Sequence, residues 1–255
     1  MPFLTVAGRS LELEWLGAAA PGKPTLVFLH EGLGSIRQWR DFPLQVVNST
    51  GCRALVYSRY GYGQSDVLRE EKAGVRFMHR EALESLPALL EALNVAEPFL
   101  VGHSDGASIA LIFAGAGHAV RGVAVMAPHV FVEPSGVESI RKAREAFEAG
   151  ELAQRLAKYH RDPRKTFYLW ADAWLDPEFL RWNIEEYLPE ISCPVLAIQG
   201  EDDEYGTMEQ LERIRRGVRG SCELLKLPAC GHSAFRDQPQ ATLGALTRFI
   251  DERCG

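Results

Sequence analysis

The sequence has no long run of apolar residues. Its longest apolar stretches, such as Thr25–Leu29 and Val123–Ala127, are as long as a strand, whereas a helix that crosses a membrane needs about 20 apolar residues. The N-terminal part lacks the basic and apolar regions of a secretory signal, because acidic and polar residues arrive by Arg9–Glu14. We therefore expect a cytoplasmic protein without a membrane partner, although a secreted chain freed of its signal would look the same.

An excess of basic residues is absent too. The chain has 28 Lys and Arg against 34 Asp and Glu, a net charge of −6, whereas proteins that bind nucleic acid usually carry a basic patch. The cysteines are few and scattered, without a C-x-x-C pair, and no H-E-x-x-H motif occurs. We therefore expect no nucleic-acid partner, no disulfide framework, no metal and no cofactor. The sequence leaves the oligomeric state open.

Short apolar runs alternate with longer helical patterns over most of the chain. This alternation is typical of the α/β class, a mostly parallel sheet flanked by helices. The predicted strands are Leu4–Val6, Leu11–Leu16, Thr25–His30, Ala54–Ser58, Phe99–His103, Val123–Ala127, Val195–Gln199 and Leu224–Leu227. The first two should form an antiparallel hairpin. The helical pattern Phe77–Leu93 contains Pro87, which should kink the helix.

Residues 133–192 break this alternation. The stretch is charged, helical in pattern, rich in aromatic residues and without a strand-like run. It is too long for a connecting loop, so we expect a helical cap inserted into a core of residues 1–132 and 193–255. Trp170 and Trp174 lie four residues apart and therefore share one helix face. They are candidates for the lining of a cleft beneath the cap, whereas most other cap aromatics should pack onto the core.

The clearest motif is Gly102-His103-Ser104-Asp105-Gly106. It follows the apolar run Pro98–Val101 and precedes the helix-like Ala107–Phe113, which is the strand–turn–helix setting of a nucleophile elbow. Such a tight turn needs residues without bulk at both glycine positions. It also places the serine hydroxyl at a helix N-terminus, where backbone N–H groups favour developing negative charge. Ser104 is therefore a candidate nucleophile.

A catalytic serine needs a base, and the base needs an orienting acid. The strand Val195–Gln199 is followed by Gly200-Glu201-Asp202-Asp203, and the strand Leu224–Leu227 leads to Gly231-His232. These motifs and their order resemble the α/β-hydrolase superfamily over essentially the whole chain. The resemblance implies a catalytic triad of Ser104, Asp203 and His232. It favours Asp203 over its neighbour Asp202, because the family's acid usually lies three residues after the glycine that ends the strand.

The resemblance also implies an oxyanion hole made by the backbone N–H groups of Gly32 and Asp105. Gly32 lies in the turn His30–Gly34, where Glu31 occupies a position that is usually glycine in the family. We expect Glu31 to brace this turn, with a side chain in solvent or a direct role as an acid left open.

Other residues near this motif set are candidates for lesser roles. His103, before the serine, and His129, just after a predicted strand, are possible substrate-binding residues. His30 and the glycine-rich loop Ser58–Ser65 are expected to be structural.

The reaction that the resemblance implies is hydrolysis of a carboxylic ester of small to medium acyl or aryl size, through an acyl-enzyme on Ser104. The partner would be a small-molecule ester. A hydrolase of carbon–carbon bonds in aromatic ring-cleavage products is an alternative, as are a thioesterase and a lactonase. Glu31 and His103 replace the glycine and amide residues typical of carbon–carbon hydrolases, which disfavours the first of these. A non-catalytic ligand-binding relative would usually have lost a triad residue, and this chain keeps all three.

Overall fold

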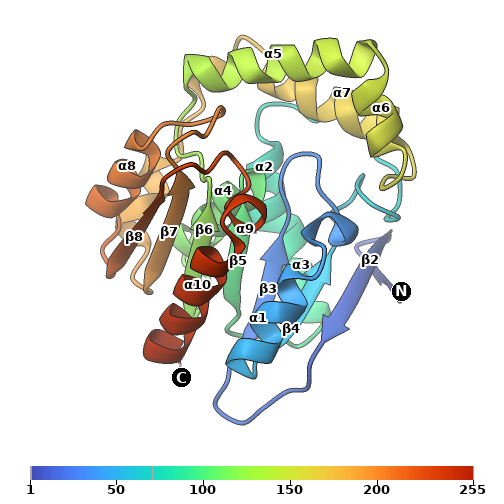
Figure 1. The fold of residues 1–255 in the computed structure, drawn as a ribbon. Helices are drawn as coiled ribbons and strands as arrows, with labels where there is room; N and C mark the ends of the chain where they lie inside the picture. The colour runs from blue at the N-terminus through green and yellow to red at the C-terminus, as the bar shows by residue number, and fades with distance from the viewer. Residues whose placement is uncertain (1, 71, 255) are drawn as a thin grey trace.

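The computed structural model describes residues 2–70 and 72–254, which build one eight-stranded sheet with helices on both faces (Figure 1). The strands are β1 Phe3–Val6, β2 Arg9–Leu16, β3 Thr25–Leu29, β4 Arg53–Tyr57, β5 Phe99–His103, β6 Gly122–Met126, β7 Val195–Gly200 and β8 Cys222–Leu227. Their order across the sheet is β1-β2-β4-β3-β5-β6-β7-β8. β1 and β2 form an antiparallel hairpin, β2 is antiparallel to β4, and the remaining pairs are parallel. The predicted α/β architecture and every predicted strand are confirmed.

Two apolar layers cover the sheet because its central strands are apolar on both faces. One layer packs α1 (Phe42–Thr50), the short α9 (Ala234–Asp237) and α10 (Pro239–Cys254) against the sheet. The opposite layer contains α3 (Leu86–Ala92), α4 (Asp105–Gly115) and α8 (Glu209–Gly217).

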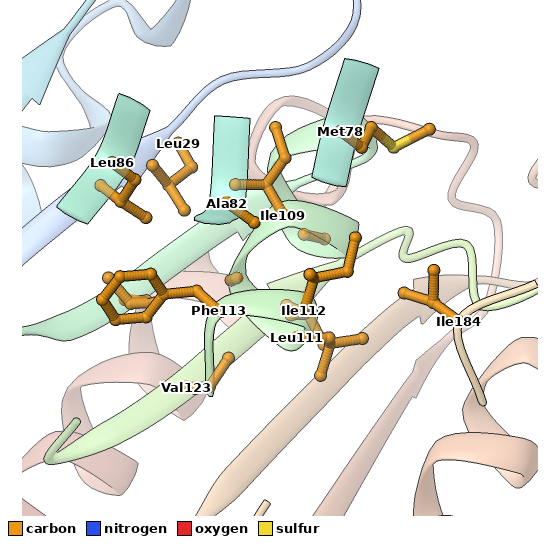
Figure 2. Packing of buried hydrophobic residues seen from close by; sticks show 14 of the residues in the cluster. Leu29, Met78, Ala82, Leu86, Ile109, Leu111, Ile112, Phe113, Val123 and Ile184 are labelled. Carbon is orange, nitrogen blue, oxygen red and sulfur yellow. The ribbon is translucent and has the colours of Figure 1, made fainter. Parts of the chain in front are cut away.

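Helix α4 lies at the centre of the second layer. Every residue from Asp105 to Gly115 is buried, as expected for a helix that is apolar on all sides. In Figure 2, Ile109, Ile112 and Phe113 of α4 lie among Met78, Leu86 and Val123 from neighbouring elements. The burial anchors the helix whose first residue follows the candidate nucleophile.

The predicted helix 77–93 is present with an irregularity. It consists of α2 (Phe77–Arg80), a π-helical turn over Glu81–Ser85, and α3. Pro87 stands at the start of α3 and has no N–H to donate to the turn before it. The π turn directly before Pro87 is the irregularity that the structure shows at this point.

Residues 133–192 carry helices and 3-10 turns between β6 and β7. They comprise α5 (Pro134–Glu148), α6 (Glu151–Leu156), α7 (Pro163–Trp174), η3 (Phe179–Arg181) and η4 (Glu185–Glu190). Figure 1 shows α5, α6 and α7 as a layer across one end of the sheet. A single bridge pairs Phe131 with Asn183, and the described residues of this segment form no named strand.

Hydrogen bonds of His160 and Thr166 tie this helical segment to loops of the core. His160 Nδ1 accepts from the N–H of Gly63 at 3.0 Å, and His160 Nε2 donates to the carbonyl of Leu33 at 2.9 Å. Thr166 Oγ1 donates to the carbonyl of Gly61 at 2.7 Å. Burial lowers the pKa of His160, which favours the neutral ring that this donor–acceptor pattern requires.

No helix in the described part of the chain is both long and apolar enough to span a membrane.

The close approach of α4 to the sheet predicts a large cost for any side chain at Gly106. A Cβ there would collide with the Leu29 carbonyl group, which is backbone and has no freedom to yield, whereas a Cβ on Gly244 of α10 would meet open space. Gly106→Ala should lower the free energy of unfolding by at least about 2 kcal/mol. Gly244→Ala should leave it unchanged or raise it by up to about 1 kcal/mol. Urea unfolding of both variants measures the difference. Equal effects on the free energy of unfolding would contradict the lack of space for a side chain at Gly106.

Candidate active site

Ser104 occupies a strained turn between β5 and α4. Its φ of 54° and ψ of −119° lie in a region that non-glycine residues rarely adopt, and such strain is typical of functional sites. The turn is tight because Gly102 and Gly106 bring β5, α4 and the end of β3 together. A Cβ on Gly102 would meet the Gly106 carbonyl, and a Cβ on Gly106 would meet that of Leu29. This geometry is that of a nucleophile elbow.

His232 is held by a buried carboxylate from the loop after β7. Its Nδ1 lies 2.8 Å from Oδ1 of Asp203. The same carboxylate accepts the N–H of Tyr205 at 2.9 Å and Nε2 of Gln199 at 3.2 Å. Asp202 has no side-chain contact with His232 among the described residues. The structure therefore brings Asp203 to the histidine, as the resemblance to the family implied.

The two partners shift each other's pKa in opposite directions. Burial alone would lower the pKa of His232, but the hydrogen bond and charge of Asp203 outweigh it and raise that pKa above its usual value. Burial would raise the pKa of Asp203, and the contact with His232 outweighs it and lowers it. The carboxylate thus stays ionised and stabilises a proton on the ring.

A cavity of about 360 Å³ lies where these residues meet, within the range of small-molecule sites. Its walls include all the predicted site residues except Asp203, which lies behind His232: Glu31, Gly32, His103, Ser104, Asp105, His129, Trp170, Trp174 and His232. A larger hollow of about 800 Å³, around residues 114–121, contains none of the predicted site residues.

The turn after β3 is held by a buried arginine that the sequence analysis missed. Arg59 donates to the carbonyls of His30 and Glu31, both at 3.0 Å. Its N–H also donates to His30 Nε2 at 3.1 Å, and His30 Nδ1 donates to the Glu31 carbonyl at 2.7 Å. Both ring nitrogens of His30 are therefore engaged in hydrogen bonds with backbone groups. The turn that carries Gly32 is rigidly positioned beside Asp105, whose N–H opens α4 and has no acceptor within the helix.

Arg59 belongs to the glycine-rich loop Ser58–Ser65, and a buried carboxylate organises this loop. Glu12 of β2 accepts from Ser58 Oγ at 2.8 Å and from the N–H of Gln64 at 2.9 Å. The Oγ of Ser65 donates to the carbonyl of Ser58 at 2.6 Å. These contacts agree with the structural role expected of the loop.

Glu31 points into the site and contacts two basic side chains. Its Oε2 lies 3.5 Å from Nδ1 of His103, and its Oε1 lies 3.8 Å from Nη2 of Arg236. Burial would raise the pKa of Glu31, but His103 and Arg236 hold it well below its usual range. His103 Nε2 in turn donates to the carbonyl of His232 at 2.9 Å. The Glu31 carboxylate thus links the turn after β3 to the residue before Ser104.

A second chain of contacts runs along the other wall of the cavity. Trp174 Nε1 donates to Oδ1 of Asp105 at 3.2 Å, and the ring of His129 packs edge-on against Trp174 with centroids 5.1 Å apart. Burial raises the pKa of Asp105 to about 6 and lowers that of His129 to about 3. His129 is therefore a neutral side chain at pH 7. The ring of Tyr205 packs at a tilt of 47° against that of His232, with centroids 4.5 Å apart.

Comparison with known proteins identifies the family to which the fold belongs. A model of the alpha/beta hydrolase family matches residues 26–245. The 2-(acetamidomethylene)succinate hydrolase of Mesorhizobium japonicum is 23% identical and covers 89% of this chain and 88% of its own. The 2-succinyl-6-hydroxy-2,4-cyclohexadiene-1-carboxylate synthase of Salmonella paratyphi C is 22% identical, and the match covers 90% of this chain and 95% of that protein. A thermophilic esterase from Thermogutta terrifontis, solved with malate bound, superposes over 100% of both chains with a TM-score of 0.79 and 19% identity.

The fold and site define a hydrolytic enzyme built on an α/β core. The chain belongs to the alpha/beta hydrolase family.

The contact between Asp203 and His232 predicts how the ring titrates. In Asp203→Asn the charge that raises the pKa of His232 is gone while burial remains, so this pKa should fall below its usual value. Asp202→Asn should leave it unchanged, because no contact joins Asp202 to the ring. NMR titration of the His232 ring in both variants measures this, and a larger shift in Asp202→Asn would contradict the assignment of the acid.

Proposed function

We propose that the protein is a serine hydrolase that cleaves carboxylic esters of small to medium acyl or aryl size through an acyl-enzyme intermediate. One observation carries the proposal. Ser104, on a strained turn at the start of α4, and His232, hydrogen-bonded to Asp203 at 2.8 Å, line the same cavity. A nucleophile, a base and an orienting acid in this relation are the parts that acyl transfer requires.

The reaction has two halves. His232 Nε2 takes the proton of Ser104 as its Oγ attacks the ester carbonyl carbon, and Asp203 stabilises the resulting imidazolium. The N–H groups of Gly32 and Asp105 hold the oxyanion of the tetrahedral intermediate. When the ester C–O bond breaks, the leaving alcohol takes the proton from His232. A water molecule, deprotonated by His232, then attacks the acyl carbon and releases the acid.

Two features of the site, at His103 and at Glu31, favour an ester over a carbon–carbon bond as the target. His103, beside the nucleophile, already donates Nε2 to the His232 carbonyl, so the amide that carbon–carbon hydrolases usually offer at this position has no equivalent. Glu31 adds an ionised carboxylate to the cavity wall. A ring-cleavage dienoate is the matched test substrate for this alternative.

We further propose that residues 133–192 act as a cap that sets specificity. Trp170 and Trp174 of α7 both line the cavity, and both are buried. Trp170 packs directly on Gly32, where a Cβ would collide with its indole ring. Trp170 also lines a second cavity, of about 140 Å³, next to Tyr62 and Leu68. Its ring therefore separates the candidate catalytic cavity from this smaller space.

Ser104→Ala should abolish ester hydrolysis, because loss of the nucleophile costs on the order of 10⁶ in kcat in a serine protease. It should also abolish labelling by a fluorophosphonate, which reacts with an activated serine. Ser233 lines the same cavity, and Ser233→Ala is the control that should still be labelled. Labelling that persists in Ser104→Ala, or is lost in Ser233→Ala alone, would contradict the assigned nucleophile.

Trp170→Ala should join the two cavities and move the preference for 4-nitrophenyl esters toward longer acyl chains. The control is Trp182→Ala, since Trp182 is a buried aromatic of the same segment that packs on Phe179 and lines neither cavity. It should lower the melting temperature without changing the chain-length profile. Kinetics on graded esters and melting curves of both variants decide this, and an unaltered profile in Trp170→Ala would exclude the proposed role.

A further inference from the structure

A strongly basic hollow adjoins the candidate catalytic cavity. It has a volume of about 420 Å³ and shares Leu33, Arg155 and Arg236 with the wall of that cavity. We call it the basic annex, defined by the five cationic residues that line it: Arg37, Arg40, Arg155, Lys158 and Arg236. No acidic residue is among its lining residues in the described part of the chain, although the protein has a net charge of −6.

The cations of the basic annex are largely without anionic partners. Arg40, Arg155 and Lys158 form no ion pair with any described residue, and Arg37 donates to a backbone carbonyl, that of Lys158, at 3.3 Å. Arg236 is the exception, with Nη2 at 3.8 Å from Glu31 and 2.8 Å from the carbonyl of Gln38. Even so, Nε of Arg236 is buried without a hydrogen-bond partner. Like charges gathered in this way repel one another, and a bound anion would relieve the repulsion.

The catalytic cavity differs from the basic annex in its charge. Glu31, Asp105 and Glu204 line it, together with Arg155 and Arg236 on the side that it shares with the basic annex, and the contacts of Glu31 keep that carboxylate ionised. The carboxylates disfavour a negatively charged group of a substrate near Ser104, whereas the cations of the basic annex attract it. The charges of the two adjoining spaces would orient an anionic substrate in a single direction.

We propose that the basic annex binds an anionic group of the substrate, a carboxylate or a phosphate, while the scissile carbonyl lies at Ser104. The inference rests on the proposed ester hydrolysis and names its substrate class, esters that carry a negative charge remote from the reacting bond. Guanidinium groups suit this role because their planar N–H donors match the oxygens of both anions.

The cations of the basic annex come from two parts of the chain, so a bound anion would also bridge these parts. Arg37 and Arg40 lie in and beside the 3-10 turn η1 (Ile36–Trp39) of the core, whereas Arg155 and Lys158 belong to α6 and the residues after it. An anion in the basic annex would therefore contact both the core and the helical segment above it. Binding of a charged substrate would hold the two together over the catalytic cavity.

Three esters with one acyl group test the inference. 4-Butanoyloxybenzoate carries a carboxylate, 4-butanoyloxyphenyl phosphate carries a phosphate, and methyl 4-butanoyloxybenzoate is neutral. The unmodified protein should prefer at least one anionic ester over the neutral one in kcat/KM, and the preferred ester tells whether carboxylate or phosphate is the fitting anion. In the double variant Arg155→Gln/Lys158→Gln this preference should fall by about tenfold, because two exposed charge contacts are lost. The fall should appear in KM and weaken at high salt.

Lys142→Gln is the matched control. Lys142 is an exposed cation of α5 that lines neither the basic annex nor the catalytic cavity, so its loss removes one positive charge, half of what the double variant loses, without touching the site. The ratio of anionic to neutral kcat/KM should be unchanged in this variant. A ratio that is the same in the double variant as in the unmodified protein, or that falls equally in Lys142→Gln, would overturn the inference.

A binding measurement separates this inference from the proposed function. Calorimetric titration of the Ser104→Ala protein with 4-hydroxybenzoate and with phenyl phosphate reports on the basic annex without any turnover. Binding of either compound that is lost with Arg155→Gln/Lys158→Gln supports the basic annex even if no ester is hydrolysed, an outcome that would refute the proposed function alone. Equal binding with and without Arg155 and Lys158, or no binding of either compound, would overturn the annex whatever the esterase activity.

Discussion

The close approach of α4 to the central strands is the constraint on which the site depends. Gly102 and Gly106 leave no room for a side chain where β5, α4 and the end of β3 meet, and the chain passes this point with Ser104 at a φ of 54°. Strain of this kind costs on the order of 1–3 kcal/mol. It persists because α4 is buried along its whole length and cannot relax away from the sheet. The packing of the core thus presents Ser104 to the cavity.

Buried charges with well-defined partners position the loops around that serine. Glu12 holds the loop after β4 through Ser58 and Gln64, and Arg59 of that loop holds the carbonyls of the turn that carries Gly32. His160 then ties the helical segment to both loops. Buried charges are stable only when hydrogen bonds satisfy them. Each loop is therefore held in place by contacts with its neighbour, and a change in one loop would disturb the next.

Features that depend on local pattern could be predicted from the sequence. The apolar runs predicted the strands, most clearly the central ones, which are covered on both faces and must be apolar. The motif around Ser104 predicted the elbow through its two glycines. The preference for Asp203 over Asp202 came from the resemblance to the family, whose acid usually lies three residues after the glycine that ends the strand. In contrast, Arg59, His160 and Arg236 make contacts that join segments far apart in the chain. A lone arginine or histidine in a sequence is most simply a solvated side chain, and no local pattern distinguishes those that meet at a cavity. The π turn before Pro87 is likewise a detail that the sequence does not specify, since the missing N–H of the proline predicts only an interruption of the helix.

The central claim is that Ser104 becomes covalently acylated, with His232 as the base that takes its proton and Asp203 as the acid that orients His232. Its most direct test is to mix the protein with an excess of 4-nitrophenyl butanoate, quench with acid within the first turnover, and identify the modified peptide by mass spectrometry. We predict one butanoyl group per chain, on the peptide that contains Ser104, formed together with a burst of 4-nitrophenol. Turnover without an acylated peptide, or a butanoyl group on any other residue, would contradict the account.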